Sequence, residues 1–227
     1  MKILAIDTAT QVCSAAIIVD AQIAGECLIS GRHKHSEKLL ALIDVLFNHA
    51  QISPHSLDLI AVSVGPGSFT GLRAGISTAQ GLAFSLGKEM VAVPTLEIIA
   101  AQAVMYHGFI CPMIDARKQQ VYTCLYRCSE TAELEKVSAD IVVDPETWIA
   151  GLPGRTLFAG SGALLYQDTI QAVLKGAADF LPEYLGIPRS STLACVAQKS
   201  YELHGPSELS RIAPLYIRLP DAAVHSA

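Results

Sequence analysis

Residues 2–8 read KILAIDT, an apolar run that ends on Asp7. Strands that are apolar on both sides are typical of a sheet whose two faces are covered by helices. Two further segments, SAAIIVD (14–20) and QIAGECLIS (22–30), follow closely on one another and predict a hairpin with a tight turn. We therefore expect the chain to open with three neighbouring strands, the first of which ends on a carboxylate.

Helices and buried strands alternate after this hairpin. The pattern predicts helices over 35–50, 68–86 and 95–106, and strands over 57–64 and 90–94. A helix between two strands of one sheet favours parallel pairing, because the chain must cross back before the next strand begins. The order β-β-β-α-β-α-β-α is the layout of a ribonuclease-H-like domain.

The same order starts again in the second half of the chain. FICPMID (109–115) is a second apolar strand that ends on an aspartate, and QQVYTCLYRC (119–128) is predicted to be the next strand. TLFAGSGA (156–163) then predicts a strand that runs into a glycine-rich turn. Two halves that begin alike predict a duplicated α/β fold.

The expected domains follow from this repeat. Residues 1–106 would form one ribonuclease-H-like domain, and residues 107–227 a smaller, reduced version of it. STLACVAQKSYELHG (191–205) predicts a late helix with stop signals at its end. We expect this helix to pack back on the first domain.

The composition limits the classes of function. Of the 227 residues, 51 % are hydrophobic and 16 % are charged, and the net charge is −5. No Lys/Arg cluster stands out, which argues against tight direct binding to nucleic acid, because such binding depends on many basic contacts. The start of the chain lacks the long apolar core of a signal peptide, and no stretch approaches the roughly 20 apolar residues of a membrane span. We therefore expect a cytoplasmic protein.

Four stretches, in this order and spacing, carry a resemblance to a known family: ILAIDTAT (3–10), GPGSFTGLRAG (65–75), IDARKQQVY (114–122) and PLYIRLP (214–220). The chain resembles the bacterial TsaB (YeaZ) proteins over nearly its whole length. The resemblance implies an actin-like, Hsp70-like fold of two ribonuclease-H-like halves. It also implies a non-catalytic role beside TsaD, a catalytic relative, and TsaE, a small ATPase. These proteins form threonylcarbamoyladenosine at position 37 of tRNAs that read codons beginning with A.

The resemblance also implies where a metal would be bound. The catalytic relative holds its metal through His-x-x-x-His at the start of the helix after the third parallel strand. Histidines four residues apart share one face of a helix, which is why this spacing chelates. Here Thr95 and Ile99 occupy the two places, and neither is a suitable ligand. We therefore expect no metal, no other cofactor and no catalytic residue in this chain.

Nucleotide binding is the second property to consider for an actin-like fold. Such enzymes hold phosphates in turns that follow a D-x-G-T pattern, because glycine lets the backbone close on the anion. The turns after Asp7 and Asp115 both lack that glycine, whereas FAGSGA (158–163) resembles a shortened adenosine-binding loop. A weak nucleotide site would comprise Asp7, Thr8, Gly160, Ser161 and Gly162. The alternative is that Asp7 is a strand-end carboxylate bonded to nearby backbone amides.

The stretch GPGSFTGLRAG (65–75) places glycines before and within a predicted helix. The spacing matches neither a dinucleotide-binding fingerprint nor a Walker loop. A glycine inside a helix costs about 1 kcal/mol relative to alanine, so Gly71 and Gly75 need a compensating close approach of another backbone. That backbone belongs either to the chain's own sheet or to a partner.

The helix predicted over 35–50 has an apolar arc of roughly 220°, which is wider than one sheet requires. With the glycine-bearing helix it would form a docking surface for the catalytic relative, or for a second copy when the chain is alone. The expected interface residues are Leu39, Leu42, Leu46, Gly71, Gly75 and Thr78. In the alternative, both helices only pack on their own sheet. Other functions left open are a degenerate actin-like metallopeptidase or kinase-like enzyme, and a stand-alone homodimeric adaptor.

Overall fold

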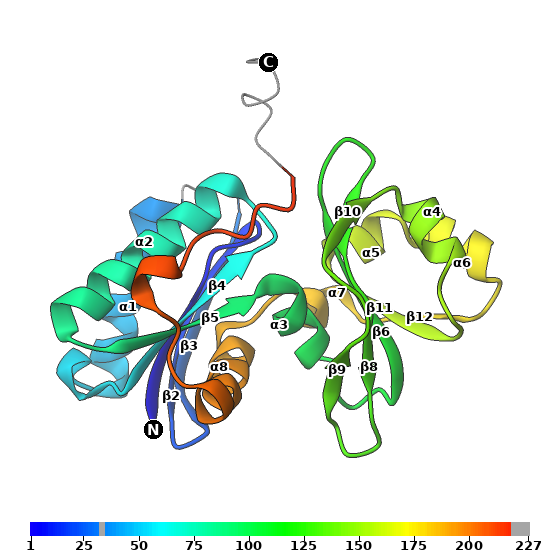
Figure 1. Ribbon diagram of the computed structural model, residues 1–227. Helices are drawn as coiled ribbons and strands as arrows, with labels where there is room; N and C mark the ends of the chain where they lie inside the picture. Colours follow the sequence, from blue (N-terminus) through cyan, green and yellow to red (C-terminus); the bar gives the residue numbers. More distant parts are fainter. Residues whose placement is uncertain (32–34, 219–227) are drawn as a thin grey trace. The chain divides into compact units, whose positions relative to one another are not determined.

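The computed structural model describes residues 1–31 and 35–218, and the chain divides into two compact units (Figure 1). Unit 1 comprises Met1–Ala101 and Pro188–Pro214, and unit 2 comprises Gln102–Ile187 and the chain from Leu215 onward. The two contiguous domains expected from the sequence therefore differ from these units, because residues 188–214 return to unit 1.

Unit 1 contains a five-stranded sheet in the order β3-β2-β1-β4-β5. Its strands are β1 (Lys2–Asp7), β2 (Val12–Val19), β3 (Gln22–Ser30), β4 (Leu59–Gly65) and β5 (Glu89–Pro94). β2 is antiparallel to both β1 and β3, whereas β1, β4 and β5 run parallel to one another. The predicted hairpin and the predicted parallel strands are thus both present.

Helices cover both faces of this sheet (Figure 1). One face carries α1 (His35–Ala50) and α2 (Phe69–Leu86), the other carries α3 (Thr95–Ala101) and α8 (Ser190–His204), and a short turn η1 (Pro54–Ser56) precedes β4. Along β1, Leu4 and Ile6 belong to the core under α1 and α2, whereas Ile3 and Ala5 belong to the core under α3 and α8. Because both faces are buried, β1 has only apolar side chains between Lys2 and Asp7.

Unit 2 contains a second sheet, in which the order β10-β7-β6-β11-β12 forms the main path. Its strands are β6 (Gly108–Asp115), β7 (Val121–Thr123), β8 (Tyr126–Cys128), β9 (Leu134–Lys136), β10 (Ile141–Val143), β11 (Thr156–Ala159) and β12 (Ala178–Phe180). β7 is antiparallel to β6 and β10, and β6, β11 and β12 are parallel. In both strand orders, the first two neighbouring pairs are therefore antiparallel and the last two are parallel, as a duplicated fold predicts.

The strand predicted over 119–128 is instead divided into β7 and β8. β7 pairs with Met113–Asp115, and β8 pairs with Gly108–Ile110, so the ladder on β6 is interrupted near Pro112. Proline has no backbone N–H to donate to a neighbouring strand. The hydroxyl of Thr123 donates to the carbonyl oxygen of Pro112 at 2.9 Å, which satisfies that acceptor in place of a ladder hydrogen bond.

Short helices complete unit 2, and its core forms between them and the sheet. They are α4 (Pro145–Ala150), α5 (Ser161–Leu165), α6 (Gln167–Leu174) and α7 (Glu183–Gly186). Phe158 of β11 is fully buried in this core and lies close to Phe180 of β12, with ring centroids 5.8 Å apart. No helix within residues 1–31 and 35–218 is long and apolar enough to cross a membrane.

The segment that returns to unit 1 packs on it in two ways. Leu193, Ala194 and Ala197 of α8 are buried against β1, β4 and β5. After α8, the N–H of Ser207 donates to the carbonyl oxygen of Met90 at 2.8 Å, which covers part of the edge of β5. A short turn η2 (Leu209–Arg211) follows it on the same unit.

Candidate functional site

Gly67 just before α2, and Gly71 and Gly75 within it, face the turn between β1 and β2. A Cβ atom on Gly67 would lie 2.1 Å from the carbonyl oxygen of Ala9, and one on Gly71 would lie 2.1 Å from that of Thr8. A Cβ atom on Gly75 would lie 2.2 Å from the hydroxyl oxygen of Thr8. Atoms cannot approach so closely, so each of these positions needs glycine. The backbone that approaches α2 belongs to the chain itself.

Hydrogen bonds fix this contact between α2 and the β1–β2 turn. The N–H of Ser68 donates to the carbonyl oxygen of Ala9 at 2.7 Å, and the hydroxyl of Thr8 donates to the carbonyl oxygen of Gly71 at 2.7 Å. Gly71 and Gly75 were expected in a partner interface, but they are buried inside unit 1. The physical reason is that the β1–β2 turn occupies the space that their missing side chains leave.

The apolar arc of α1 also lies mostly inside unit 1. Leu39, Leu42 and Leu46 are buried in the core between the sheet and α2, so they are not available as free interface side chains. The arc is wide because α1 contacts β2, β3 and α2 at once. Thr78 on α2 is half-buried. Of the six expected interface residues, five are therefore interior in this structure, and the surface of the two helices is made by other side chains.

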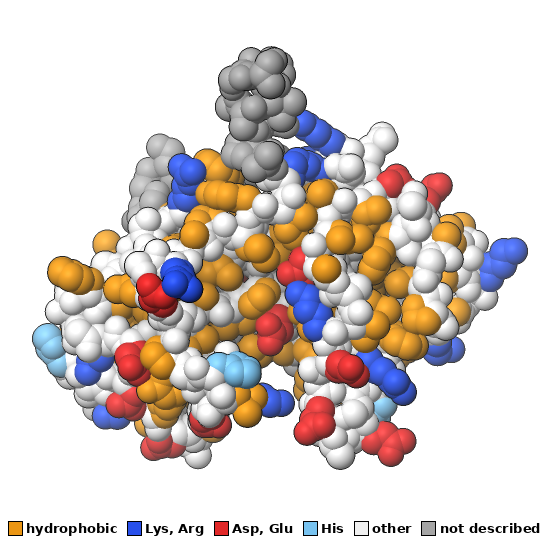
Figure 2. Space-filling view, in the orientation of Figure 1, with side chains coloured by type: hydrophobic (Ala, Val, Ile, Leu, Met, Phe, Trp, Pro, Cys, Tyr) orange, Lys and Arg blue, Asp and Glu red, His pale blue; other side chains and the backbone are white. Residues whose placement is uncertain are grey.

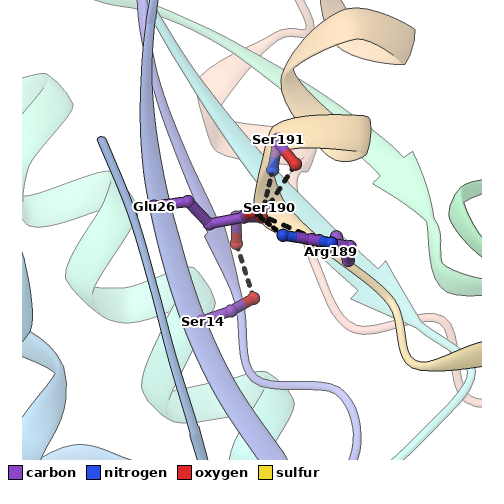
Figure 3. A network of polar contacts seen from close by, with 5 residues as sticks. All are labelled: Ser14, Glu26, Arg189, Ser190 and Ser191. Carbon is purple, nitrogen blue, oxygen red and sulfur yellow. Dashed lines mark hydrogen bonds and ion pairs between the residues drawn. The ribbon is translucent and has the colours of Figure 1, made fainter. Parts of the chain in front are cut away.

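Three polar residues lie side by side at the carboxyl end of β1. Asp7 is opposite Ser14 of β2, and the register between β1 and β4 places Ser63 on its other side. All three are buried, and Asp7 is 0 % exposed. Ser14 shares a 2.7 Å hydrogen bond with Ser190 at the start of α8, which closes this end of the row (Figure 3). The row therefore lies beneath α8 and away from water.

The Asp7 carboxyl has few partners for a buried acid. Its Oδ1 accepts a hydrogen bond from the N–H of Ala9 at 3.3 Å, and its Oδ2 has no hydrogen-bond partner among the described residues. The hydroxyls of Ser63 and Thr95 are also buried without a partner in the part of the chain that the structure describes. Burial raises the pKa of Asp7 to about 7, although the nearby Ser63 hydroxyl and the Ala9 amide lower it in part.

This geometry bears on the nucleotide site that the sequence suggests. Asp7 and Thr8 are buried in unit 1, and the hydrogen bond from Ala9 fits the alternative in which Asp7 is bonded to nearby backbone amides. In unit 2, the Oγ of Ser161 accepts a hydrogen bond from the N–H of Asp115 at 3.2 Å. A Cβ atom on Gly162 would lie 3.1 Å from Met113, so this glycine packs tightly on the sheet. Within each unit, these residues make internal contacts.

The places of the missing metal ligands lie in the first turns of α3. Thr95 and Ile99 are both buried, so they face the interior of unit 1. A hydroxyl and a hydrocarbon side chain do not form the nitrogen, sulfur or carboxylate set that zinc or iron prefers. Among the described residues, no group of three or more His, Cys, Asp or Glu side chains is arranged to hold a metal ion.

A second polar network, which sequence reasoning missed, holds the start of α8 (Figure 3). Glu26 of β3 accepts hydrogen bonds from the guanidinium of Arg189, with its Nε at 3.1 Å, and from the N–H and hydroxyl of Ser191 at 2.9 and 2.8 Å. Burial acts to raise the pKa of Glu26, but its bonds to Arg189 and Ser191 outweigh that effect and hold the pKa below its usual range. A carboxylate at a helix N-terminus is also favoured by the helix dipole.

The glutamate thus caps a helix whose N-cap residue, Arg189, lies 163 residues further along the chain. The sequence around Glu26 does not indicate that this residue caps a helix, because its partners become neighbours only when residues 188–214 return to unit 1. The contact explains why α8 begins where it does, since Arg189 offers no side-chain cap of its own.

Comparison with known proteins places the chain in a family. A family model described as "TsaD: tRNA N6-adenosine threonylcarbamoyltransferase" matches residues 28–226. The tRNA threonylcarbamoyladenosine biosynthesis protein TsaB of Bacillus subtilis is 33 % identical over 98 % of this chain and 96 % of its own length. The structure of YeaZ from Pseudomonas aeruginosa superposes with a TM-score of 0.82 at 27 % identity, over 95 % of this chain and 99 % of that one.

A more distant structure bears on the fold alone. The ROK hexokinase of Thermus thermophilus superposes with a TM-score of 0.52 at 9 % identity, over 89 % of this chain and 99 % of that one. Together with the repeated sheet order, this confirms the predicted actin-like fold. The chain belongs to the TsaB (YeaZ) family, within the wider group that the TsaD family model describes.

Proposed function

We propose that this protein is a non-catalytic subunit in the formation of threonylcarbamoyladenosine at position 37 of tRNAs that read codons beginning with A. Its partners are TsaD, the catalytic relative, and the ATPase TsaE, and it meets tRNA as part of the assembled complex in the cytoplasm. The names of its relatives support the pathway. The observation that carries the non-catalytic role is Asp7, which stands at the end of β1 and is 0 % exposed.

The surroundings of Asp7 support a role without catalysis or a cofactor. A catalytic carboxylate must reach the atom on which it acts. Asp7 instead lies beneath the start of α8 in a row of buried polar residues, and its Oδ1 accepts a hydrogen bond from the backbone N–H of Ala9. The two metal-ligand places hold Thr95 and Ile99, which are buried as well. The activity of the complex would then come from the catalytic relative.

The exposed side of α1 and α2 is the docking surface that we propose for TsaD. α2 has 18 residues, of which only Arg73 is charged, and Figure 2 shows few charged side chains over this helix. On α1, Leu40 is 58 % exposed and Val45 is 45 % exposed. Depletion of charge beside exposed apolar side chains is typical of protein interfaces.

Small residues on the same side of α2 would let a partner helix approach. Ala74 is half-buried, Ser77 and Gly81 are exposed, and a Cβ atom on Gly81 would meet nothing within 4 Å. These positions differ from the interior glycines of the helix, whose space is filled by the β1–β2 turn. The occupant that we propose is the related surface of TsaD, with a second copy of this chain as the occupant when TsaD is absent.

The experiment compares two variants, each of which replaces an exposed apolar side chain with arginine. Val45→Arg places a charge within the proposed docking surface, and Leu203→Arg places one on the exposed side of α8. We expect Val45→Arg to prevent assembly with TsaD, measured as complex mass by light scattering, while Leu203→Arg assembles normally. Thermal melting checks that both variants fold. If both variants fold and assemble with TsaD equally well, the docking surface lies elsewhere on the protein. Failure of the unaltered protein to assemble with TsaD would contradict the proposed function itself.

A further inference from the structure

Three buried side-chain oxygens without a hydrogen-bond partner lie at one end of the first sheet. They are Oδ2 of Asp7, Oγ of Ser63 and Oγ1 of Thr95, and none of them has a partner within residues 1–31 and 35–218. The three residues are at most 1 % exposed. A buried polar group without a partner is costly, because it has given up its hydrogen bonds to water. Buried polar groups in folded proteins are therefore almost always hydrogen-bonded.

Asp7 and Ser63 are neighbours on two adjacent parallel strands. β1 pairs with β4 up to Ile6 with Val62, and the next position in this register joins Asp7 with Ser63. The Ser63 hydroxyl is close enough to the Asp7 carboxyl to lower its pKa, although neither Oγ of Ser63 nor Oδ2 of Asp7 has a partner with hydrogen-bond geometry. A small molecule that bonds to both oxygens would satisfy both.

Thr95 comes to the same end of the sheet from the strand on the other side of β4. β5 and β4 are parallel, with Val93 beside Ser63 and Pro94 beside Gly65. Thr95 follows directly and begins α3, which contacts β4. The third unpartnered oxygen is therefore supplied by the first residue of a helix that packs on the strand carrying the second.

The helices α3 and α8 cover this end of the sheet. Ala5 and Ala61 precede Asp7 and Ser63 by two positions, and both lie in the core that α3 and α8 cover. Because side chains alternate along a strand, Asp7 and Ser63 point into the same layer as these alanines. The polar residues thus form the end of an apolar interior that bulk solvent does not reach.

We propose that one water molecule is enclosed at this end of the sheet, hydrogen-bonded to Oδ2 of Asp7 and to the hydroxyls of Ser63 and Thr95. A buried water typically makes about three hydrogen bonds to polar groups that otherwise lack a partner. Its two hydrogens and its lone pairs suit an acceptor-only carboxylate beside hydroxyls, which both donate and accept. The water would join β1, β4 and the start of α3 in a single network.

Water also suits both protonation states of Asp7. It donates to the carboxylate when Asp7 is ionised, and it accepts from the O–H when Asp7 is protonated. Burial raises the pKa of Asp7 to about 7, so both states occur near neutral pH. Because α3 and α8 close the site, the water exchanges with bulk solvent only when one of these helices moves. Its residence time should therefore be much longer than that of water on the protein surface.

The solution experiment counts long-lived water molecules by oxygen-17 magnetic relaxation dispersion. The test variant is Ser63→Ala with Thr95→Val, which removes two of the three partners with little change of shape. The control is Thr156→Val, which removes a buried hydroxyl that already donates within the chain, to the carbonyl oxygen of Gly154 at 2.9 Å. Thermal melting checks that both variants fold. We expect the test variant to hold one long-lived water fewer than the unaltered protein, and the control to hold the same number.

A high-resolution crystal structure of the unaltered protein tests the inference without any substitution. We expect a water peak about 2.7–3.2 Å from Oδ2 of Asp7 and from the hydroxyl of Ser63 or Thr95. A direct hydrogen bond between Asp7 and Ser63 with no peak beside it would overturn the inference. Contacts of about 2.0–2.6 Å to the peak would also overturn it, because they mark a metal ion. An equal number of long-lived waters in a folded test variant and in the unaltered protein would contradict it as well. If the test variant does not fold, the crystal structure decides alone.

Discussion

The hydroxyl of Thr8 donates a hydrogen bond to the carbonyl oxygen of Gly71 across 2.7 Å, and the same oxygen of Thr8 occupies the space where a Cβ atom of Gly75 would lie. One threonine therefore connects the β1–β2 turn with two successive turns of α2. The close approach that the glycines permit is made within unit 1, and it ties the first strand to the helix that carries the proposed docking surface.

Alanine at Gly75 is expected to destabilise the protein. Its Cβ atom would overlap the hydroxyl of Thr8, and overpacking of a buried contact costs about 1–3 kcal/mol. Gly81→Ala is the matched control on the same helix, because that position is open. It should raise the free energy of unfolding by up to about 1 kcal/mol, the difference in helix propensity. Urea denaturation measures both; equal effects of the two substitutions would contradict the close contact with Thr8.

Asp7 is expected to make stability depend on pH. Its pKa is about 7 in the folded protein, against 3.8 in the unfolded chain. Between these values the folded state binds the additional proton, so the free energy of unfolding falls as pH rises, and it levels off above the folded pKa. Integrated over this window, the loss is on the order of 4 kcal/mol.

Asp7→Asn removes the titrating group at nearly constant shape. In the variant, the free energy of unfolding should therefore fall less between pH 4 and pH 7 than it does in the unaltered protein. At pH 8 the variant should be the more stable of the two by a few kcal/mol. Chemical denaturation across this pH range provides the measurement. A variant that follows the same pH curve as the unaltered protein would show that Asp7 keeps an ordinary pKa.

Glu26 is expected to act in the opposite direction. Its pKa is lowered in the folded state, so its contribution to stability is present above the unfolded pKa and is lost as pH falls through the folded pKa. Glu26→Gln should destabilise unit 1 by about 2 kcal/mol at neutral pH, because the start of α8 loses its charged acceptor. Hydrogen exchange should show the loss first at the N-terminus of α8. Unchanged protection of Ser191 and its neighbours would contradict the capping role.

Gln119→Gly in the turn between β6 and β7 is expected to stabilise the protein, although it deletes a long, exposed side chain. Gln119 has a φ of 57°, and glycine adopts this left-handed conformation without the strain that glutamine carries there, but it also has more freedom in the unfolded chain. The net gain should be about 0.5 kcal/mol in the free energy of unfolding. Lys199→Gly, within α8, is the comparison and should destabilise by about 1 kcal/mol. A loss of stability in Gln119→Gly would mean that the β6–β7 turn is not strained.

Local signals in the sequence predict unit 1 better than unit 2, where β9, β10, β12, α4, α6 and α7 are not predicted. Ser68 accepts a hydrogen bond from the N–H of Gly71 at the start of α2, and Gly87 ends that helix with a φ of 65°, as the residue types indicate. The apolar strand that ends on Asp7 is equally plain. The segment 119–128 is predicted as one strand but is divided into β7 and β8 where it passes Pro112 of β6. Its own sequence does not indicate this division, because the proline lies on the neighbouring strand.

The surroundings of the candidate sites depend on contacts that no local pattern contains. The apolar arc of α1 indicates that more than a sheet must cover it, but not that α2 is the cover. The glycine spacing of α2 indicates a close neighbour, but not that the neighbour is Thr8. Glu26 and Arg189 are 163 residues apart in the chain, and Ala116 and Arg218 are 102 apart. Only the tertiary fold brings the members of each pair together.

The return of residues 188–214 to unit 1 has a consequence for the order in which the protein can form during synthesis. Ile3, Ala5 and Leu59 pack beneath α8, so this side of the first sheet is covered only by α3 until α8 has left the ribosome. Most of unit 2 has been made by then, since its residues 102–187 precede α8 in the chain. The part of the chain that is made first is therefore among the last to complete its interior, and its nascent apolar face is a natural client for a chaperone.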